Sequence, residues 1–122
     1  RHGEPDGGRR FRGSSIDDAL SDTGWKQMWA AIPEQADWDI IISSPLARCS
    51  GFANALSENL NIPIQIHNNL KEIGFGTWEG RTPEDVQEND GSAYQDFYTD
   101  PVNNRPEGAE ALETFSERIW AA

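Results

Sequence analysis

The first four residues, Arg1-His2-Gly3-Glu4, place a guanidinium, an imidazole and a carboxylate side by side ahead of any long apolar segment. A histidine beside an arginine is most often a solvated surface residue, so this segment alone is a weak indication of a site. Two other features strengthen it. Arg48 follows Ser43-Ser44-Pro45 at the expected start of a helix, and Glu72 precedes a glycine-rich turn.

A phosphoryl group is the ligand that best explains two arginines, a histidine and a helix start in one chain. Guanidinium groups bind phosphate oxygens in pairs, and helix N-termini present unpaired N–H groups with a partial positive charge. If Arg1 and Arg48 each follow a parallel strand, both lie at the carboxyl edge of one sheet, where open α/β folds bind ligands. For Arg48 alone, an exposed helical arginine is the alternative interpretation.

The chemistry that fits these groups is hydrolysis in two steps. A neutral histidine can attack phosphorus, so that the phosphoryl group is transferred to nitrogen before water releases it. The leaving oxygen needs a proton, which a carboxylic acid can give before it activates the water. Glu72 and Glu4 are the candidates for this acid. Glu79 is a third carboxylate nearby, but Glu72 is favoured over it because Glu72 precedes the glycine-rich turn. The alternative for Glu72 is an ordinary surface carboxylate.

The composition predicts one folded domain with a modest core. A chain of 122 residues has the usual size of one domain and is short for two. Only 23 of its residues are Leu, Ile, Val or Phe, a fraction at which disorder is an alternative. Five Trp residues argue against disorder, because each can bury a large apolar area.

Charge and cysteine content exclude several classes of partner. The net charge of −11 repels polyanions, so no nucleic-acid partner is expected. No apolar run approaches the length of a membrane-spanning helix and no signal peptide is visible, so no membrane partner is expected. The single cysteine, Cys49, excludes an internal disulfide and fits a reducing compartment, which predicts a cytoplasmic location. The oligomeric state is not predicted.

The first half of the chain is predicted to form a helix, followed by a strand, a second helix and a second strand. Ser21 is a good N-cap for a helix over residues 22–31, and residues 38–42 form a short apolar run typical of a buried strand. Ser44 as N-cap and Pro45 at the first helical position predict a helix to about residue 59. Alternating isoleucines at residues 62–66 predict the next strand, and hence a right-handed crossover and a parallel sheet.

The second half is expected to be less regular. Thr82 and the residues after it predict a short helix to about residue 88. Residues 89–107 are rich in Gly, Asn, Asp and Pro, which indicates an irregular segment with one helical turn around Tyr94 to Tyr98, forming a lid or a wall of a pocket. A last helix over residues 108–120 carries Leu112, Phe115, Ile119 and Trp120 at helical spacing, as expected for core residues.

In order and spacing, the motifs of this chain resemble the histidine phosphatase superfamily, also called the phosphoglycerate mutase-like family. The resemblance covers nearly the whole chain, and the residues 72–80 are most similar to the α-ribazole phosphatase branch. It implies an α/β fold, a three-layer α/β/α sandwich with a mostly parallel central sheet. The motifs are Arg1-His2-Gly3-Glu4, Arg10-Phe11-Arg12-Gly13, Asp17 with Leu20 and Gly24, Ser43-Ser44-Pro45-Leu46-Ala47-Arg48, and residues 70–80.

The resemblance also implies roles for single residues. His2 is then the phosphohistidine nucleophile, Glu72 the proton donor, Arg1 and Arg48 the phosphate ligands, and Arg10 a supporting basic residue. The family needs no metal or other cofactor for this chemistry, and no metal-ligand spacing is present. The implied partners are a small phosphorylated metabolite, with α-ribazole 5′-phosphate as the candidate, and inorganic phosphate as product.

Two departures from the family pattern affect what is expected. Family members commonly carry Asn where this chain has Gly8, so Arg9 or Arg10 is expected to replace that phosphate contact. The family's second catalytic histidine, in a His-Gly turn, has no counterpart, so residues 1–122 are expected to be part of one domain that lacks its first strand and its C-terminal part. The missing histidine makes a non-catalytic phosphate-binding module an alternative, and a phosphoglycerate mutase-type transfer is a second alternative. The short Gly7-Gly8 loop, and no long insertion after Gly80, favour water as the acceptor.

Overall fold

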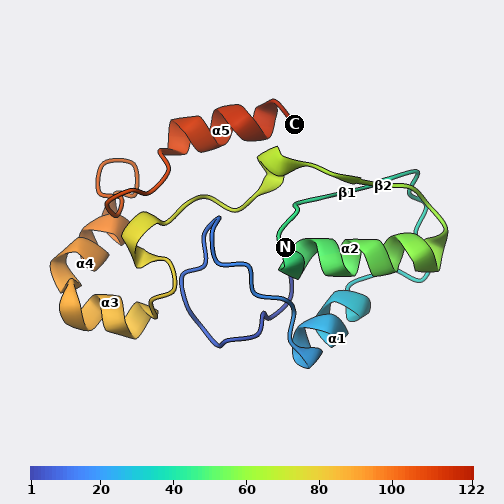
Figure 1. Cartoon of the computed structure of the whole chain (residues 1–122), viewed down its shortest axis with the longest axis horizontal. Helices are drawn as coiled ribbons and strands as arrows, with labels where there is room; N and C mark the ends of the chain where they lie inside the picture. Colours follow the sequence, from blue (N-terminus) through green and yellow to red (C-terminus); the bar gives the residue numbers. More distant parts are fainter. The chain divides into compact units, whose positions relative to one another are not determined.

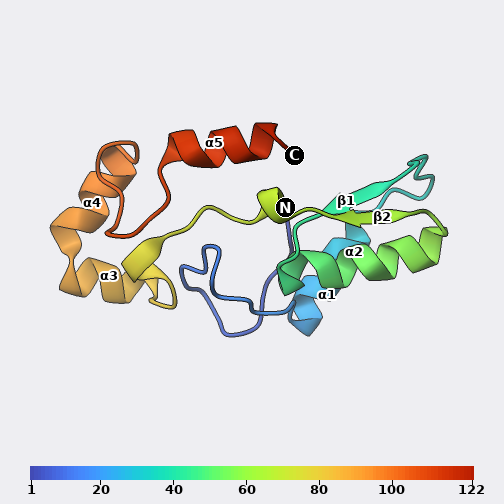
Figure 2. The ribbon, with the colours of Figure 1, turned by 45° about the horizontal axis from the view of Figure 1, so that its top comes forward.

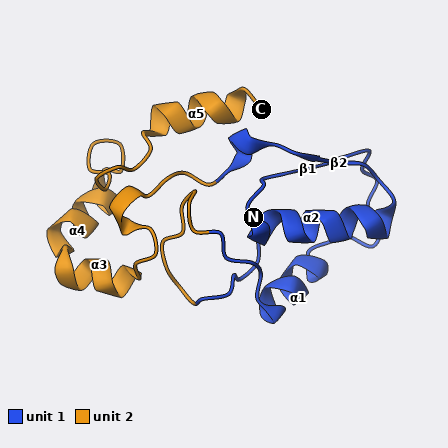
Figure 3. Cartoon of the chain, viewed as in Figure 1, with its two compact units in different colours: residues 1–7, 17–71 blue, residues 8–16, 72–122 orange.

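The computed structural model describes all 122 residues and divides into two compact units (Figure 3). Unit 1 consists of Arg1–Gly7 and Asp17–Lys71, and unit 2 of Gly8–Ile16 and Glu72–Ala122. Neither unit is a continuous stretch of sequence, because residues 8–16 leave the N-terminal segment and join the second half of the chain. That the whole chain forms one domain stays a prediction.

Unit 1 contains a parallel pair of strands and the helix that connects them. Helix α1 (Asp22–Ala30) is followed by β1 (Ile41–Ser43), α2 (Ala47–Leu60), β2 (Ile64–Ile66) and a 3₁₀ turn, Asn68–Leu70. The two strands are parallel, with Ile41 opposite Ile64 and Ser43 opposite Ile66, and they lie side by side in Figures 1 and 2. The predicted strand, helix and strand with parallel pairing is confirmed.

The first strand is shorter than its predicted range of residues 38–42. Trp38 and Ile40 lie outside β1 and are exposed. Pairing begins with the bond from the Ile41 N–H to the Pro63 carbonyl at 2.9 Å. Proline has no N–H, so Pro63 cannot donate the next hydrogen bond to a residue before Ile41, and the strand does not extend back toward Trp38.

The core of unit 1 lies between α1, α2 and β1. Leu20, Phe52 and Leu56 are buried, and Trp25 packs against them with its ring centre 5.8 Å from that of Phe52. The Ser21 hydroxyl accepts from the Gly24 N–H at 3.0 Å, so the predicted N-cap of α1 is confirmed.

Unit 2 is built around an aromatic cluster. Its elements are a 3₁₀ turn (Gly76–Trp78), α3 (Pro83–Asn89), α4 (Gly91–Thr99) and α5 (Leu112–Trp120). Phe11 packs against Phe75 and Trp78, with ring centres 5.2 Å apart in both pairs, and Val86 is fully buried beside them. The predicted cap of α3 is confirmed, since the Thr82 side chain accepts from the Asp85 N–H.

Two predictions in the second half are wrong in extent. Helix α4 runs for nine residues, whereas one turn was predicted. Its length was not predicted because it begins at Gly91, and glycine is a weak helix former. Helix α5 begins at Leu112 and not at Gly108, whose φ of +76° is left-handed and cannot belong to a right-handed helix. Trp120, predicted to be core, is 88% exposed at the end of α5. None of the helices combines the length and the apolar character needed to cross a bilayer.

Candidate active site

The His2 segment is held in unit 1 by pairing between residues 4–6 and 19–21. The Asp6 N–H donates to the Ala19 carbonyl at 2.8 Å and the Ser21 N–H to the Glu4 carbonyl at 2.9 Å. Gly24 allows this close approach, because a Cβ there would lie 2.1 Å from the Glu4 carbonyl oxygen. His2, which is half-buried, is thus attached to the start of α1 through backbone contacts.

One hydrogen bond defines the tautomer of His2. Its Nδ1 lies 2.7 Å from the Gly3 carbonyl oxygen. A carbonyl oxygen can only accept, so Nδ1 must carry the hydrogen, and the lone pair of the neutral ring is then on Nε2. The atom of His2 that can attack phosphorus is therefore Nε2.

Arg48 is buried in the first turn of α2 and is only 1% exposed. The alternative interpretation of an exposed helical arginine is therefore wrong. A buried guanidinium is tolerated when its N–H groups are paired, and no buried side-chain nitrogen or oxygen in the structure lacks a hydrogen-bond partner. Arg48 is thus held in one place by packing and hydrogen bonds, whereas Arg1 is exposed.

The start of α2 differs from the prediction. Leu46, not Ser44, is the N-cap residue, and the helix begins at Ala47. The Ser44 hydroxyl accepts from the Leu46 N–H at 3.2 Å, and the Asp17 carboxylate accepts from the Ala47 N–H at 2.6 Å. The expectation that N–H groups at this helix start are free to bind an anion is therefore wrong for these two groups, because both already donate to side chains of the protein.

The other predicted residues, Glu72 and Arg10, belong to unit 2. Glu72 is exposed, and its Oε1 accepts from the Ile73 N–H at 2.9 Å. In a protonated carboxyl group that accepts through one oxygen, the other oxygen, here Oε2, carries the proton. Arg10 is half-buried, and its neighbour Arg9 lies 3.6 Å from the Glu84 carboxylate, with both side chains largely exposed.

Glu79 and Glu4, the other acidic candidates, have structural contacts. The Glu79 carboxylate accepts from the backbone N–H groups of Ser14 at 2.9 Å and Phe75 at 3.1 Å, and from the Ser15 hydroxyl. Those bonds join residues 8–16 to the glycine-rich turn inside unit 2. Glu4 takes part in unit 1 through its backbone groups, which bond Ser21 and Gln27. That Glu72 is the acid stays a prediction.

Glu110 and Arg118 were missed by the sequence analysis. Arg118 Nε donates to Glu110 Oε1 at 2.6 Å, and its Nη2 donates to the carbonyl of Glu72 at 3.1 Å. Both side chains are about one-fifth exposed. Arg118 is one of only three basic residues after Lys71, a scarcity in the acidic half of the chain that could have drawn attention to it.

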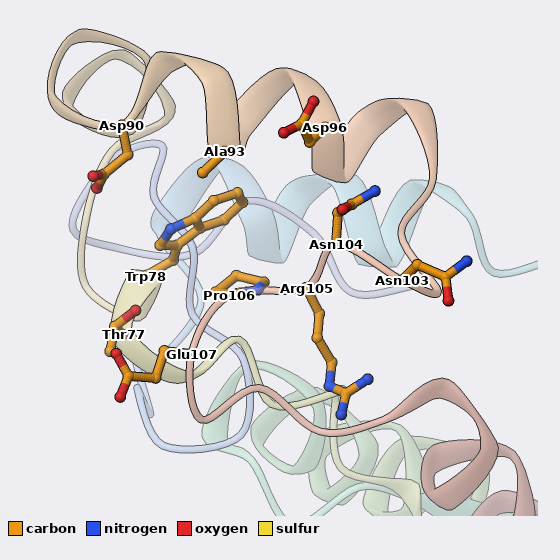
Figure 4. A pocket seen from close by; sticks show the side chains of 10 residues that line it. All are labelled: Thr77, Trp78, Asp90, Ala93, Asp96, Asn103, Asn104, Arg105, Pro106 and Glu107. Carbon is orange, nitrogen blue, oxygen red and sulfur yellow. The ribbon is translucent and has the colours of Figure 1, made fainter.

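A hollow of about 400 Å³ lies in unit 2, lined by the 3₁₀ turn, α4 and residues 103–107 (Figure 4). Residues of the segment 89–107 line this hollow, but their predicted place at a substrate pocket stays a prediction. Three carboxylates, Asp90, Asp96 and Glu107, line it against one basic residue, Arg105. This excess of negative charge disfavours a phosphate there.

Comparison with known proteins places the chain in a family. Residues 1–122 match the model of the histidine phosphatase superfamily, branch 1. The adenosylcobalamin/α-ribazole phosphatase of Salmonella typhimurium is 31% identical over 69% of this chain and 42% of its own length. The glucosyl-3-phosphoglycerate phosphatase of Mycolicibacterium vanbaalenii is 36% identical over 67% of this chain and 38% of its own.

Solved structures agree with this assignment. The native mycobacterial glucosyl-3-phosphoglycerate phosphatase is 27% identical, with a TM-score of 0.83 over 97% of this chain and 57% of that one. Its complex with inorganic phosphate has a TM-score of 0.77. The chain thus spans less than two thirds of each of these relatives. The predicted fold class, α/β with a parallel sheet, is confirmed by these phosphoglycerate mutase-like neighbours, and the chain belongs to branch 1 of the histidine phosphatase superfamily.

Proposed function

We propose that this protein hydrolyses phosphate monoesters of small metabolites through a phosphohistidine on His2. Arg1, Arg48 and Arg10 bind the phosphate, and Glu72 exchanges the protons. The observation that carries the proposal is the hydrogen bond from His2 Nδ1 to the Gly3 carbonyl, because it leaves the nucleophilic lone pair on Nε2. Membership of the histidine phosphatase superfamily supports it.

The proposed reaction has two steps. His2 Nε2 attacks phosphorus, the bond from phosphorus to the ester oxygen breaks, and that oxygen takes the proton of the Glu72 carboxyl group as the alcohol leaves. Water then attacks the phosphohistidine and gives a proton to the Glu72 carboxylate, so that inorganic phosphate departs and neutral His2 returns. The arginines balance the phosphate charge in both steps, and the residues assigned here use no metal or other cofactor.

The substrate is proposed to be an alkyl phosphate, with α-ribazole 5′-phosphate as the first candidate because residues 72–80 are most similar to that branch. Relatives of similar identity are named for different esters, including a glucosyl-3-phosphoglycerate phosphatase and a phosphoserine phosphatase. Initial rates with these three esters, measured side by side, identify the preferred class. Conversion of 3-phosphoglycerate to its isomer without release of phosphate would instead indicate a mutase.

Replacing His2 by Ala in the full-length protein tests the proposal. Hydrolysis of p-nitrophenyl phosphate should be sensitive to vanadate and should fall by at least about a thousandfold in His2→Ala, as when other covalent nucleophiles are removed. His67→Ala is the matched control, because His67 is the other histidine of residues 1–122 and lies at the start of a 3₁₀ turn. Activity retained in His2→Ala removes this residue from the mechanism. Phosphate binding without turnover in the wild type indicates a non-catalytic module.

A further inference from the structure

The segment that carries Glu72 is bonded to one ion pair in unit 2. Glu110 Oε1 accepts from Arg118 Nε at 2.6 Å, and Glu110 Oε2 accepts from Arg118 Nη2 at 2.8 Å. The same Nη2 donates to the Glu72 carbonyl at 3.1 Å. Glu110 Oε2 also accepts from the Gly74 N–H at 3.3 Å, and the Glu110 N–H donates to the Gly74 carbonyl at 2.9 Å.

These bonds fix the backbone on both sides of the Ile73 N–H, the group that contacts the Glu72 carboxyl group. Arg118 holds the carbonyl of residue 72, Glu110 holds both polar groups of Gly74, and the Ile73 N–H between them donates to Glu72 Oε1 at 2.9 Å. The orientation of the carboxyl group is therefore tied to backbone atoms that the ion pair holds in place. Arg118 is itself held over the ring of Phe115, 4.8 Å from its centre.

We propose that Glu110 and Arg118 are positioning residues for proton transfer by Glu72. This inference rests on the proposed function, in which Glu72 protonates the leaving oxygen. An ion pair that only joins two side chains at a surface contributes little. This pair differs because two of its side-chain hydrogen bonds end on backbone atoms within two residues of the proposed acid, and each side chain is about one-fifth exposed.

The dependence of the rate on the leaving group separates positioning from simple support of the fold. An alkoxide is a poor leaving group and needs the proton of Glu72 as the phosphorus–oxygen bond breaks. The anion of dinitrophenol leaves without that proton. The quantity compared is kcat/KM, because for both esters it reports the steps up to formation of the phosphohistidine. A misplaced acid therefore slows the alkyl ester selectively, whereas general damage to the protein slows both.

The test compares four forms of the full-length protein with two esters. The wild type, Glu72→Gln, Glu110→Gln and Asp85→Asn are assayed with 2,4-dinitrophenyl phosphate and with phosphoserine or α-ribazole 5′-phosphate, whichever the wild type hydrolyses faster. Asp85→Asn is the matched control, because it breaks another pair in unit 2, Arg81 Nε to Asp85 Oδ2, with the same 2.6 Å separation. Urea unfolding of each form shows whether it is folded. Arg118→Lys replaces Glu110→Gln if the latter does not fold, since lysine keeps the charge but lacks the guanidinium fork.

The expected result is a selective loss. Glu110→Gln should lower kcat/KM for the alkyl ester by about 10- to 100-fold, the scale of a small misplacement of a catalytic group, and that for the dinitrophenyl ester by less than about twofold. Glu72→Gln should show the same selectivity with a larger loss, and Asp85→Asn should change neither. Equal losses, or no loss, in Glu110→Gln beside a selective Glu72→Gln overturn the positioning role alone. A non-selective Glu72→Gln overturns the acid role itself, and the positioning role with it.

Discussion

At the scale of single residues, short backbone contacts orient the groups proposed to react. The Gly3 carbonyl defines the tautomer of His2, and the Ile73 N–H occupies one oxygen of Glu72. Both contacts are to neighbours in sequence, so each group is oriented locally before any long-range packing is considered. The long-range part is the close approach of Gly3 to Gly24, where a Cβ on Gly3 would lie 2.5 Å from the Gly24 carbonyl oxygen.

Replacement of Gly24 by Ala should therefore disturb the segment that carries His2. The new Cβ would lie 2.1 Å from the Glu4 carbonyl oxygen, and the overlap should cost about 1–3 kcal/mol in free energy of unfolding. It should also lower kcat, because residues 2–4 must move. Urea unfolding and p-nitrophenyl phosphate hydrolysis measure both. Gly51→Ala is the control, since a Cβ there meets nothing nearer than a Trp25 carbon at 3.7 Å. A Gly24→Ala protein as stable and active as Gly51→Ala contradicts this account.

Residue type identified some of the candidate site and could not identify the rest. His2, Arg48 and Glu72 stand in motifs whose chemistry is evident from the side chains. Asp17 and Glu110 have roles that come from contacts 30 and 36 residues away in sequence, which no local pattern indicates. The burial of Arg48 was likewise not predicted, because a helical arginine next to a turn is usually solvated.

At the scale of elements, α2 positions Arg48, and its N-terminus is closed by Asp17. A carboxylate at this end accepts a hydrogen bond from the Ala47 N–H, and its negative charge interacts favourably with the positive end of the helix dipole. The Asp17 carboxylate is thus expected to fix where the helix starts and where Arg48 lies in its first turn.

Asp17→Ala should lower the free energy of unfolding by about 0.5–2 kcal/mol, the usual cost of losing a side chain that accepts from an N–H at a helix N-terminus. Glu58→Ala is a matched control in the same helix, because Glu58 is exposed near the C-terminal end, where a negative charge is unfavourable. Chemical denaturation of both variants should show destabilisation in Asp17→Ala and none in Glu58→Ala. Equal effects would show that the carboxylate does not act through the helix N-terminus.

The contact of α5 with the Glu72 segment should depend on pH. The hydrogen bond from Arg118 lowers the pKa of Glu110 below its ordinary value of 4.5. A lowered carboxyl pKa in the folded state contributes stability that is present above the ordinary pKa and is lost as the pH falls through the folded value. Glu110→Gln should therefore reduce the loss of stability as the pH falls below 4.5, the ordinary pKa of this carboxyl group. Urea midpoints across that range measure it.

The lowered pKa values of Asp85 and Asp100 remain in the variant, so some acid sensitivity should persist. Identical pH profiles in the two proteins would rule out this contribution.

Elements with clear caps or turn residues were predicted well, and the others were not. Ser21 and Thr82 indicated the starts of α1 and α3, and the alternating isoleucines indicated β2. Helix α4 has no side-chain cap and begins at Gly91, so its local signals were those of a loop. The helical spacing of Trp120 predicted burial, but spacing defines a face of a helix and does not say what covers it.

At the scale of the whole molecule, the chain is divided into units that interleave in sequence (Figure 3). This division was not predicted from the sequence, because residues 8–16 carry no signal for the aromatic partners that they meet in unit 2. Phe11 packs against Phe75 and Trp78, more than 60 residues away. The proposal draws His2 and Arg48 from unit 1 and Glu72 from unit 2, so its chemistry is tested only in the full-length protein.

Trapping the phosphorylated intermediate tests the central claim most directly. The full-length protein is mixed with p-nitrophenyl phosphate, quenched in alkali within one turnover, digested, and examined by mass spectrometry for phosphopeptides. The account predicts an acid-labile, alkali-stable phosphate on the peptide that contains His2, none on the peptide that contains His67, and none in His2→Ala. Phosphate on another residue, or complete turnover with no phosphorylated protein at any time, would contradict it.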